Sequence, residues 1–215
     1  KSDGATTYHL RDFATYLYRK REFNFYKNLY IVDNRQSHHF LQLFKVLELA
    51  GYDPQSDSIH VDLGFMSLPE GPISTRKGNI ISLQALFDEA EKRAVAIIDE
   101  KNPELANKQK VASQVALAAI KYFDLSHNRK TEFTFTWDTA LSFEGNTGPY
   151  LQYAHARIHG ILRKVGEVSI KYDEESIKLD ELETAVLRKL YTFPEILAEV
   201  IHDATPNLIC NYLFE

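Results

Sequence analysis

Apolar and polar positions in the first third of the chain alternate between a helical period and short apolar runs. Residues 7–19 predict a helix, and the apolar run over residues 28–33 ends in a polar turn, which is typical of a buried strand. Apolar positions then repeat at helical spacing up to Gly51, a residue type that commonly ends helices, and residues 58–63 predict a second strand. Strand, helix and strand joined this closely predict a right-handed βαβ unit of a parallel sheet, whose ligands bind at the carboxyl ends of the strands.

The middle of the chain changes from this pattern to a polar loop and then to long helices. Residues 64–79 form a polar connection with two prolines and adjacent cations, where we expect a mobile basic loop. Ser82 can then cap a helix, and a second helix is predicted over residues 108–125. Residues 134–137 alternate as a short strand or an extended arm would.

The last part of the chain reads as helices that start at Gly148 and break at Pro194 and Pro206. An α/β part followed by an all-α part implies two domains, which we place at residues 1–146 and 147–215.

The helix that starts at Gly148 carries two adjacent surfaces. At about 100° per residue, an apolar arc that we expect to face the core is formed by Leu151, Ala154, Ile158, Ile161, Leu162 and Val165. Beside it lies a narrow stripe of aromatic and basic residues, namely Tyr150, Tyr153, Arg157 and Lys164. Such a stripe suits contacts to phosphates and bases. The alternative is that the tyrosines pack on a neighbouring domain and the cations are simply solvated.

Composition narrows the class of protein without identifying it. The 215 residues are 44% apolar, as in an ordinary globular protein, and the net charge of −5 excludes a global basic field of the kind that attracts nucleic acid. The single cysteine, Cys210, excludes an internal disulfide framework and a CxxC zinc ribbon. No apolar run reaches the length of a membrane span, the first residues contain no apolar region of the kind found in signal peptides, and the sequence does not begin with methionine. We expect a cytoplasmic fragment of a larger protein, without a membrane segment.

Tyr8, Asp12 and Gln36 combine into a candidate site for a guanidinium group. Tyr8 and Asp12 are four residues apart and so share a helix face, while Gln36 follows the first strand at its carboxyl end. A carboxylate offers a planar guanidinium two acceptor oxygens, and the phenol and amide add oriented hydrogen bonds. The alternative is that Asp12 pairs with Arg11 or a nearby lysine and that Tyr8 is half-buried packing.

The basic loop and the histidines are weaker candidates. Ser74, Thr75, Arg76 and Lys77 bring two hydroxyls and two cations to one loop, as the stabilisation of departing phosphate requires, although a solvated turn has the same composition. The histidine pair that follows the first strand, at positions 38 and 39, is better placed to touch a nucleotide than a metal, although one of the two could be a core residue.

A second histidine pair, His155 and His159, shares a face of the helix that starts at Gly148. No third ligand is evident in the sequence beside this pair, so we expect no metal site there.

Five stretches of the sequence occur together in a fixed order that characterises one family. They are 1–4 (KSDG) with Tyr8, Arg11 and Asp12; 32–40 (VDNRQSHHF); 74–79 (STRKGN); 135–138 (FTWD); and 143–157 (FEGNTGPYLQYAHAR). In these motifs the whole chain resembles the second half of a class I arginyl-tRNA synthetase. The resemblance implies an incomplete Rossmann-like parallel sheet, from the second half of the catalytic domain, followed by the start of a helical anticodon-binding domain.

The resemblance also implies roles for individual residues. Tyr8, Asp12 and Gln36 would bind the arginine side chain, and nucleotide contacts would come from His38, His39, Gly64, Phe65 and Met66. The loop with Ser74, Arg76 and Lys77 would be the counterpart of the Lys-Met-Ser-Lys-Ser signature. Both lysines of that signature are replaced here, and the His-Ile-Gly-His signature is absent from the chain.

The implied reaction is the ligation of arginine to tRNA(Arg) in two steps. Arginine is activated with ATP, bound as its Mg²⁺ complex, and the arginyl group then passes to the tRNA; family members typically need bound tRNA for the first step. We expect a monomer, and we expect this chain alone to be inactive because it lacks the upstream signature. The alternatives are a non-catalytic RNA-binding module and a synthetase-like paralogue that serves as a scaffold.

Overall fold

The computed structural model describes residues 4–69, 71–72, 82–166 and 178–215. The chain forms two compact units. Unit 1 contains Lys1–Phe65 with Arg129–Glu132, and unit 2 contains Met66–Asn128 with Phe133–Glu215.

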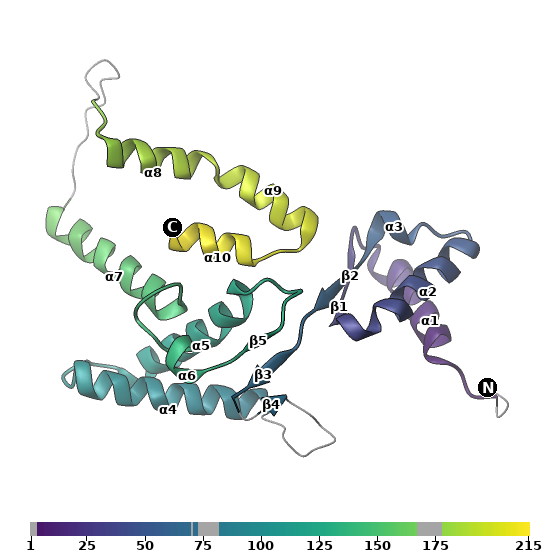
Figure 1. Ribbon diagram of the computed structural model, residues 1–215, viewed down its shortest axis with the longest axis horizontal. Helices are drawn as coiled ribbons and strands as arrows, with labels where there is room; N and C mark the ends of the chain where they lie inside the picture. The colour runs from purple at the N-terminus through teal and green to yellow at the C-terminus, as the bar shows by residue number, and fades with distance from the viewer. Residues whose placement is uncertain (1–3, 70, 73–81, 167–177) are drawn as a thin grey trace. The chain divides into compact units, whose positions relative to one another are not determined.

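Unit 1 is the predicted βαβ element with one helix before it. Its elements are α1 (Tyr8–Phe23), β1 (Asn28–Asp33), the 3-10 turn η1 (Asn34–Gln36), α2 (Ser37–Leu49), α3 (Pro54–Asp57) and β2 (Ser58–Leu63). Strands β1 and β2 are parallel, with Asn28 opposite Ser58 and Asp33 opposite Leu63 (Figure 1). Both predicted strands are therefore confirmed, together with their parallel pairing.

Local sequence signals set the ends of the helices in unit 1. The Thr7 side chain accepts a hydrogen bond from the backbone N–H of Leu10 and so caps α1. Helix α2 ends before Gly51, whose φ of +86° is a left-handed conformation that glycine adopts without a side-chain clash. The core of the unit lies where α1 and α2 meet β1, and consists of Tyr16, Tyr30, Phe40, Leu43 and Leu47.

A buried polar network ties α3 to α1. The Asp57 carboxylate accepts hydrogen bonds from Tyr16 Oη at 3.0 Å, Lys20 Nζ at 2.6 Å and Ser58 Oγ at 2.8 Å. Burial disfavours the charged form of Asp57, but these three donors outweigh it and hold the pKa of the carboxyl below its ordinary value. Burial, reinforced by the hydrogen bond to Asp57, raises the pKa of the Tyr16 phenol.

Unit 2 combines a small sheet with helices. Its strands are β3 (Met66–Leu68), β4 (Gly71–Pro72) and β5 (Phe133–Thr134), and β3 pairs antiparallel with β4 and parallel with β5. Its helices are α4 (Leu83–Lys101), α5 (Lys108–Ser126), α6 (Trp137–Ala140), α7 (Gly148–Val165), α8 (Glu181–Tyr191), α9 (Phe193–Asp203) and α10 (Asn207–Phe214). The expected loop at residues 64–79 is therefore partly strand. The pairing of β3 with β5 came from segments 67 residues apart, which local patterns do not link.

The packing of α4 on α5 depends on small side chains. Ala90 and Ala94 of α4 and Ala112 and Ala116 of α5 are almost fully buried, which lets the two helices lie close together (Figure 1). A second cluster joins β3 to the end of α5 and to α6, through Leu68, Phe123, Phe135 and Ala140. The predicted cap at Ser82 and the predicted helix start at Gly148 are confirmed, since Ser82 caps α4 and α7 begins at Gly148.

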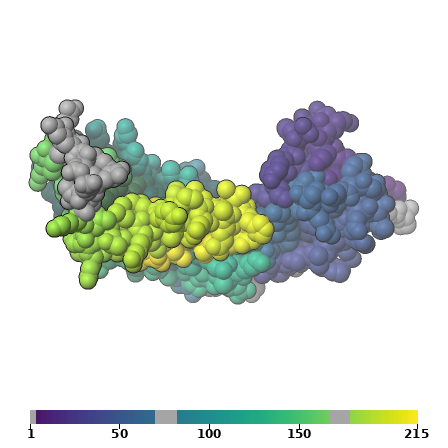
Figure 2. Space-filling view, turned by 90° about the horizontal axis from the view of Figure 1, so that it is seen from above, coloured from purple at the N-terminus to yellow at the C-terminus, as the bar shows by residue number. Residues whose placement is uncertain are grey.

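The apolar arc of α7 is only partly buried, which corrects the expectation that it faces a core. Leu151 and Ala154 are half-buried where α7 packs on α5, but Ile158, Ile161, Leu162 and Val165 are 55–58% exposed. The helices that follow contact one another and α5 through α10, and do not cover this end of α7 in the part of the chain that is described. Figure 2 shows α8 and α9, in yellow-green, uncovered on the face that it presents.

The predicted helix breaks near the prolines are confirmed. Pro194 lies in the first turn of α9 and Pro206 immediately precedes α10. Among the helices described here, none is both long and apolar enough to cross a membrane.

Candidate functional site

Tyr8 and Asp12 lie on one face of α1, as the spacing predicted. Tyr8 is 76% exposed, and the guanidinium of Arg11 lies over its ring at 5.9 Å. Arg11 Nε donates to Thr6, and Asp12 pairs instead with His39, whose Nε2 lies 2.7 Å from Asp12 Oδ2. The alternative pairing of Asp12 with Arg11 or a lysine is therefore wrong.

A cluster of imidazole and amide groups surrounds this hydrogen bond at the contact between α1 and α2. The ring centres of His9 and His39 lie 4.1 Å apart, and His9 Nε2 donates a hydrogen bond to Gln42 Oε1 at 2.9 Å. The Gln42 amide in turn donates to His38 Nε2 at 3.0 Å. Sequence reasoning missed His9 because nothing local marks it as a partner of α2.

Gln36 and the end of β1 lie beside the first turn of α2. Gln36 is exposed and immediately precedes α2, three residues before His39. At the strand end, Arg35 donates to both oxygens of Asp33, at 2.8 and 2.6 Å, and its guanidinium lies 5.3 Å from the centre of the Phe65 ring. The hydrogen bonds from Arg35 lower the pKa of Asp33. Parallel strands gather ligands at this edge, so the arrangement presents donors and acceptors where a ligand is expected.

Gly64 occupies a close contact with a distant segment. Its N–H donates to the carbonyl of Arg129 at 2.5 Å, and a Cβ at this position would lie 2.2 Å from the carbonyl oxygen of Thr131. Arg129 also donates to the Asp62 carboxylate and, at 2.8 Å, to the Asp62 carbonyl. Burial opposes ionisation of Asp62, but the Arg129 guanidinium outweighs it and lowers the pKa of that carboxyl. Only glycine fits at position 64.

Met66 and the basic loop remain among the residues predicted for the nucleotide. Met66 belongs to β3, and its half-buried side chain packs on the cluster that contains Leu68 and Phe123. The loop with Ser74, Arg76 and Lys77 lies outside the described residues.

The stripe on α7 has two environments. Tyr150 is half-buried and packs edge-to-face against Phe214 of α10 at 5.6 Å, which is a contact within the helical part of the chain and not with a neighbouring domain. Tyr153 is 52% exposed, and Arg157 and Lys164 are exposed as well. The exposed part of the stripe is therefore free to meet a ligand, whereas Tyr150 is partly used to hold α10.

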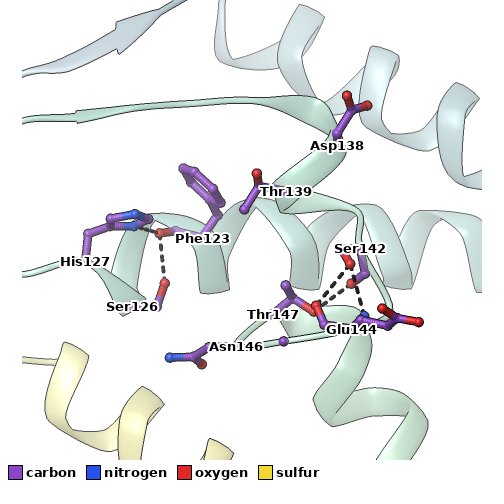
Figure 3. Close-up of a pocket in the computed structure, with 10 residues that line it drawn as sticks. Phe123, Ser126, His127, Asp138, Thr139, Ser142, Glu144, Asn146 and Thr147 are labelled. Carbon is purple, nitrogen blue, oxygen red and sulfur yellow. Dashed lines mark hydrogen bonds between the residues drawn. The ribbon is translucent and has the colours of Figure 1, made fainter.

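A cavity of about 540 Å³ in unit 2 involves none of the predicted residues. Its lining comes from the end of α5, from α6 and from residues 142–147 (Figure 3). Its polar groups largely serve the local backbone: His127 Nδ1 donates to the Phe123 carbonyl, and Thr147 Oγ1 donates to the Ser142 carbonyl. Figure 3 shows the carboxylate of Glu144 directed away from the other labelled side chains. Across the described ranges, no group of three or more His, Cys, Asp and Glu side chains could hold a metal ion.

Two family models match the chain. The model for tRNA synthetases class I (R), catalytic domain, matches residues 1–137, and the model for the DALR anticodon binding domain matches residues 151–215. The first match alone covers more than half of the chain.

Sequence relatives and solved structures agree with these matches. The arginine–tRNA ligase of Lactococcus lactis subsp. cremoris (strain MG1363) is 44% identical over 213 residues, and that of Halothermothrix orenii is 39% identical over 215. The alignments cover 99% and 100% of this chain, which spans 38% of the length of each relative. The arginyl-tRNA synthetase of Thermus thermophilus has a TM-score of 0.86 at 31% identity, over 100% of this chain and 40% of the other. That of Plasmodium falciparum, at 24% identity, shares the fold with a TM-score of 0.80 over 99% of this chain and 36% of its own.

Proposed function

Because the chain belongs to the class I arginyl-tRNA synthetases, we propose that it carries the arginine pocket of an ATP-dependent arginine–tRNA ligase. The observation that carries the proposal is the Asp12 carboxylate, which is 42% exposed and held at one oxygen by His39. Asp12 lies on α1, and its partner His39 lies in the first turn of α2, which follows the carboxyl end of β1. A fixed and accessible carboxylate in this position is suited to a guanidinium.

The proposed reaction has two steps. The carboxylate of arginine attacks the α-phosphate of ATP, supplied as its Mg²⁺ complex, and pyrophosphate leaves. The hydroxyl of the terminal ribose of tRNA(Arg) then takes the arginyl group, and AMP leaves. Within this reaction Tyr8, Asp12 and Gln36 bind the side chain of arginine, and His38, Gly64 and Phe65 lie near the nucleotide. Arg76 and Lys77 stabilise the charge that develops on pyrophosphate.

Discrimination against lysine follows from the shape of the two cations. The planar guanidinium of arginine can donate two parallel hydrogen bonds to a carboxylate, whereas a lysine ammonium acts as a point charge and leaves acceptors unpaired. Unpaired polar groups in a closed site cost about 1–3 kcal/mol each, which is up to about a hundredfold in selectivity per group.

The helical part from residue 147 is proposed to contact tRNA through the exposed residues of the α7 stripe. Tyr153 offers a face for stacking on a base, and Arg157 and Lys164 offer charges for phosphates. We place the boundary between the two domains at residues 146 and 147, inside the interval of 138–150 that separates the two family matches. A monomer in the cytoplasm remains the expected form.

Substitution of Asp12 in the intact protein tests the arginine pocket. Asp12→Ala should reduce arginine-dependent exchange between ATP and pyrophosphate, measured with tRNA present, by on the order of a hundredfold or more, because the guanidinium loses its anionic partner. Glu22→Ala removes another exposed acid of α1, paired only locally with Arg21, and serves as the control. Exchange that is unchanged in Asp12→Ala would remove Asp12 from the pocket.

The basic loop has a separate test. Arg76→Ala combined with Lys77→Ala should slow formation of the adenylate more than it weakens arginine binding, as seen in single-turnover kinetics against the arginine concentration. A selective loss of arginine affinity, with the rate at saturation preserved, would contradict the role of this loop.

A further inference from the structure

The imidazole of His39 makes its only described hydrogen bond to the carboxylate that we place in the arginine pocket. We propose that His39 is a positioning residue, which orients Asp12 for the guanidinium of arginine and does not itself contact the nucleotide. The inference rests on the proposed function, because it needs Asp12 to bind arginine. Its basis is the 2.7 Å contact between His39 Nε2 and Asp12 Oδ2, which joins α2 to α1.

Packing holds the His39 ring in place. Its side chain is only 20% exposed, against 42% for Asp12. The ring of His9 lies against it at 4.1 Å, and the buried ring of Phe40 meets it edge-on at 5.4 Å. Phe40 is fixed in turn by a stacked contact with His60 at 4.3 Å. An imidazole enclosed in this way keeps one orientation, so the direction of its N–H is set by the fold.

The chemistry of the contact determines what His39 does for Asp12. An ionised carboxylate only accepts hydrogen bonds, so His39 must donate from Nε2. One donor at Oδ2 restricts the rotation of the carboxylate and leaves Oδ1 without a partner among the described residues. A carboxylate has about four lone-pair positions, so a guanidinium can still dock on it after one is used. An oriented acceptor loses less freedom on binding than one that rotates.

This assignment separates His39 from its neighbour His38. His38 is exposed, so its ring can meet a ligand even though its Nε2 accepts a hydrogen bond from Gln42. The Nε2 of His39 is already engaged by Asp12. The two adjacent histidines should therefore affect different substrates, arginine for His39 and ATP for His38.

The test uses the intact protein and measures the KM for arginine and the KM for ATP separately, by ATP–pyrophosphate exchange with tRNA present. His39→Leu keeps an apolar side chain of similar bulk but removes the donor, and should raise the KM for arginine about tenfold. The KM for ATP should change by less than about twofold, because no nucleotide contact is lost. His39→Gln places an amide N–H near the position of Nε2 and should restore most of the arginine KM. Lys45→Ala, on the exposed side of α2, is the matched control.

Two further measurements distinguish positioning from stability. A variant that is merely less stable loses active enzyme and so lowers kcat without a selective change in the KM for arginine, and thermal unfolding of each variant records that loss directly. In the Asp12→Asn background His39→Leu should add less than about a twofold effect, because the two residues act through one contact.

Each result has one meaning for the inference. A tenfold rise in the arginine KM with rescue by glutamine supports it. A rise in the ATP KM alone, or no change in the arginine KM while Asp12→Ala is defective, overturns it and leaves the proposed function intact. If Asp12→Ala itself retains normal exchange, the arginine pocket is misassigned and the role of His39 falls with it.

Discussion

Replacing Asp57 by alanine perturbs the polar network that anchors α3 to α1. The carboxylate accepts hydrogen bonds from the phenol of Tyr16, the ammonium of Lys20 and the hydroxyl of Ser58. Alanine removes all three acceptor interactions at once. The donors differ in exposure: Tyr16 is 1% exposed and Ser58 is 5% exposed, whereas the Lys20 side chain is 42% exposed.

These exposures decide the size of the effect. The buried Tyr16 hydroxyl is left without a partner, which costs about 1–3 kcal/mol. The Ser58 hydroxyl also loses its acceptor, but it can rotate to another one, which limits the cost to about 1 kcal/mol. Lys20 returns to water, so its ion pair contributes about 0–1 kcal/mol after solvent screening. The expected loss in the free energy of unfolding is therefore about 2–5 kcal/mol.

Urea unfolding followed by far-ultraviolet circular dichroism measures this loss, and hydrogen exchange at the amides of β1 assigns it to unit 1. Asp53→Ala is the matched control, because Asp53 caps α3 through a single 3.3 Å hydrogen bond and should cost only about 1 kcal/mol. Adding Tyr16→Phe to Asp57→Ala removes the unpaired hydroxyl and should regain about 1 kcal/mol. A loss below about 1 kcal/mol, or no gain in the double variant, would refute the reasoning.

The remaining predictions concern pH, a helix contact and a polar junction. Burial opposes ionisation of Asp62, but Arg129 holds the pKa of this carboxyl below its ordinary value. The ionised carboxylate therefore stabilises the fold above about pH 4, and this contribution is lost as the pH falls further. Urea titrations at pH values between 7 and 2 would record the loss. Gly148→Ala should destabilise unit 2, because its Cβ would lie 2.5 Å from a carbonyl oxygen of α5. At Gly160 in the same helix a Cβ would lie 4.0 Å from the Arg163 side chain, an ordinary contact, so Gly160→Ala should be neutral or stabilising by up to about 1 kcal/mol in thermal unfolding. Tyr122→Phe removes a hydroxyl whose single proton faces two acceptors in unit 2, Asn146 Oδ1 at 2.5 Å and the Cys210 carbonyl at 2.7 Å, and should cost about 1–3 kcal/mol. Urea unfolding followed by the fluorescence of the single tryptophan, which lies in the same unit, measures this cost, and an unchanged midpoint would contradict it.

Much of the candidate site could be predicted because its signals are local. The spacing of Tyr8 and Asp12 placed both on one helix face, and the apolar run before Asp33 located the strand end that Gln36 follows. The order of the motifs indicated the family before any tertiary contact was known. What spacing could not supply was the partner of Asp12, since His39 lies 27 residues away and is one of three histidines near that contact.

The sequence by itself determined the hydrophobic periodicity of the helices and strands, where they begin and end, and their order along the chain. The strands over residues 28–33 and 58–63, the caps at Ser82 and Gly51 and the helix start at Gly148 all depend on interactions within a few residues, which a linear pattern records. The tertiary structure decided which groups meet. Arg129 reaches Asp62 across 67 residues, and β3 pairs with β5 across a similar interval.

Burial was the other quantity that only the fold could decide. The apolar arc of α7 has a uniform helical pattern, yet only Leu151 and Ala154 are half-buried against α5, while the rest of the arc, including Val165, remains exposed. Periodicity shows which side chains share a face, because the geometry of a helix is local. Whether that face is covered depends on where distant segments pass, and therefore on the path of the whole chain.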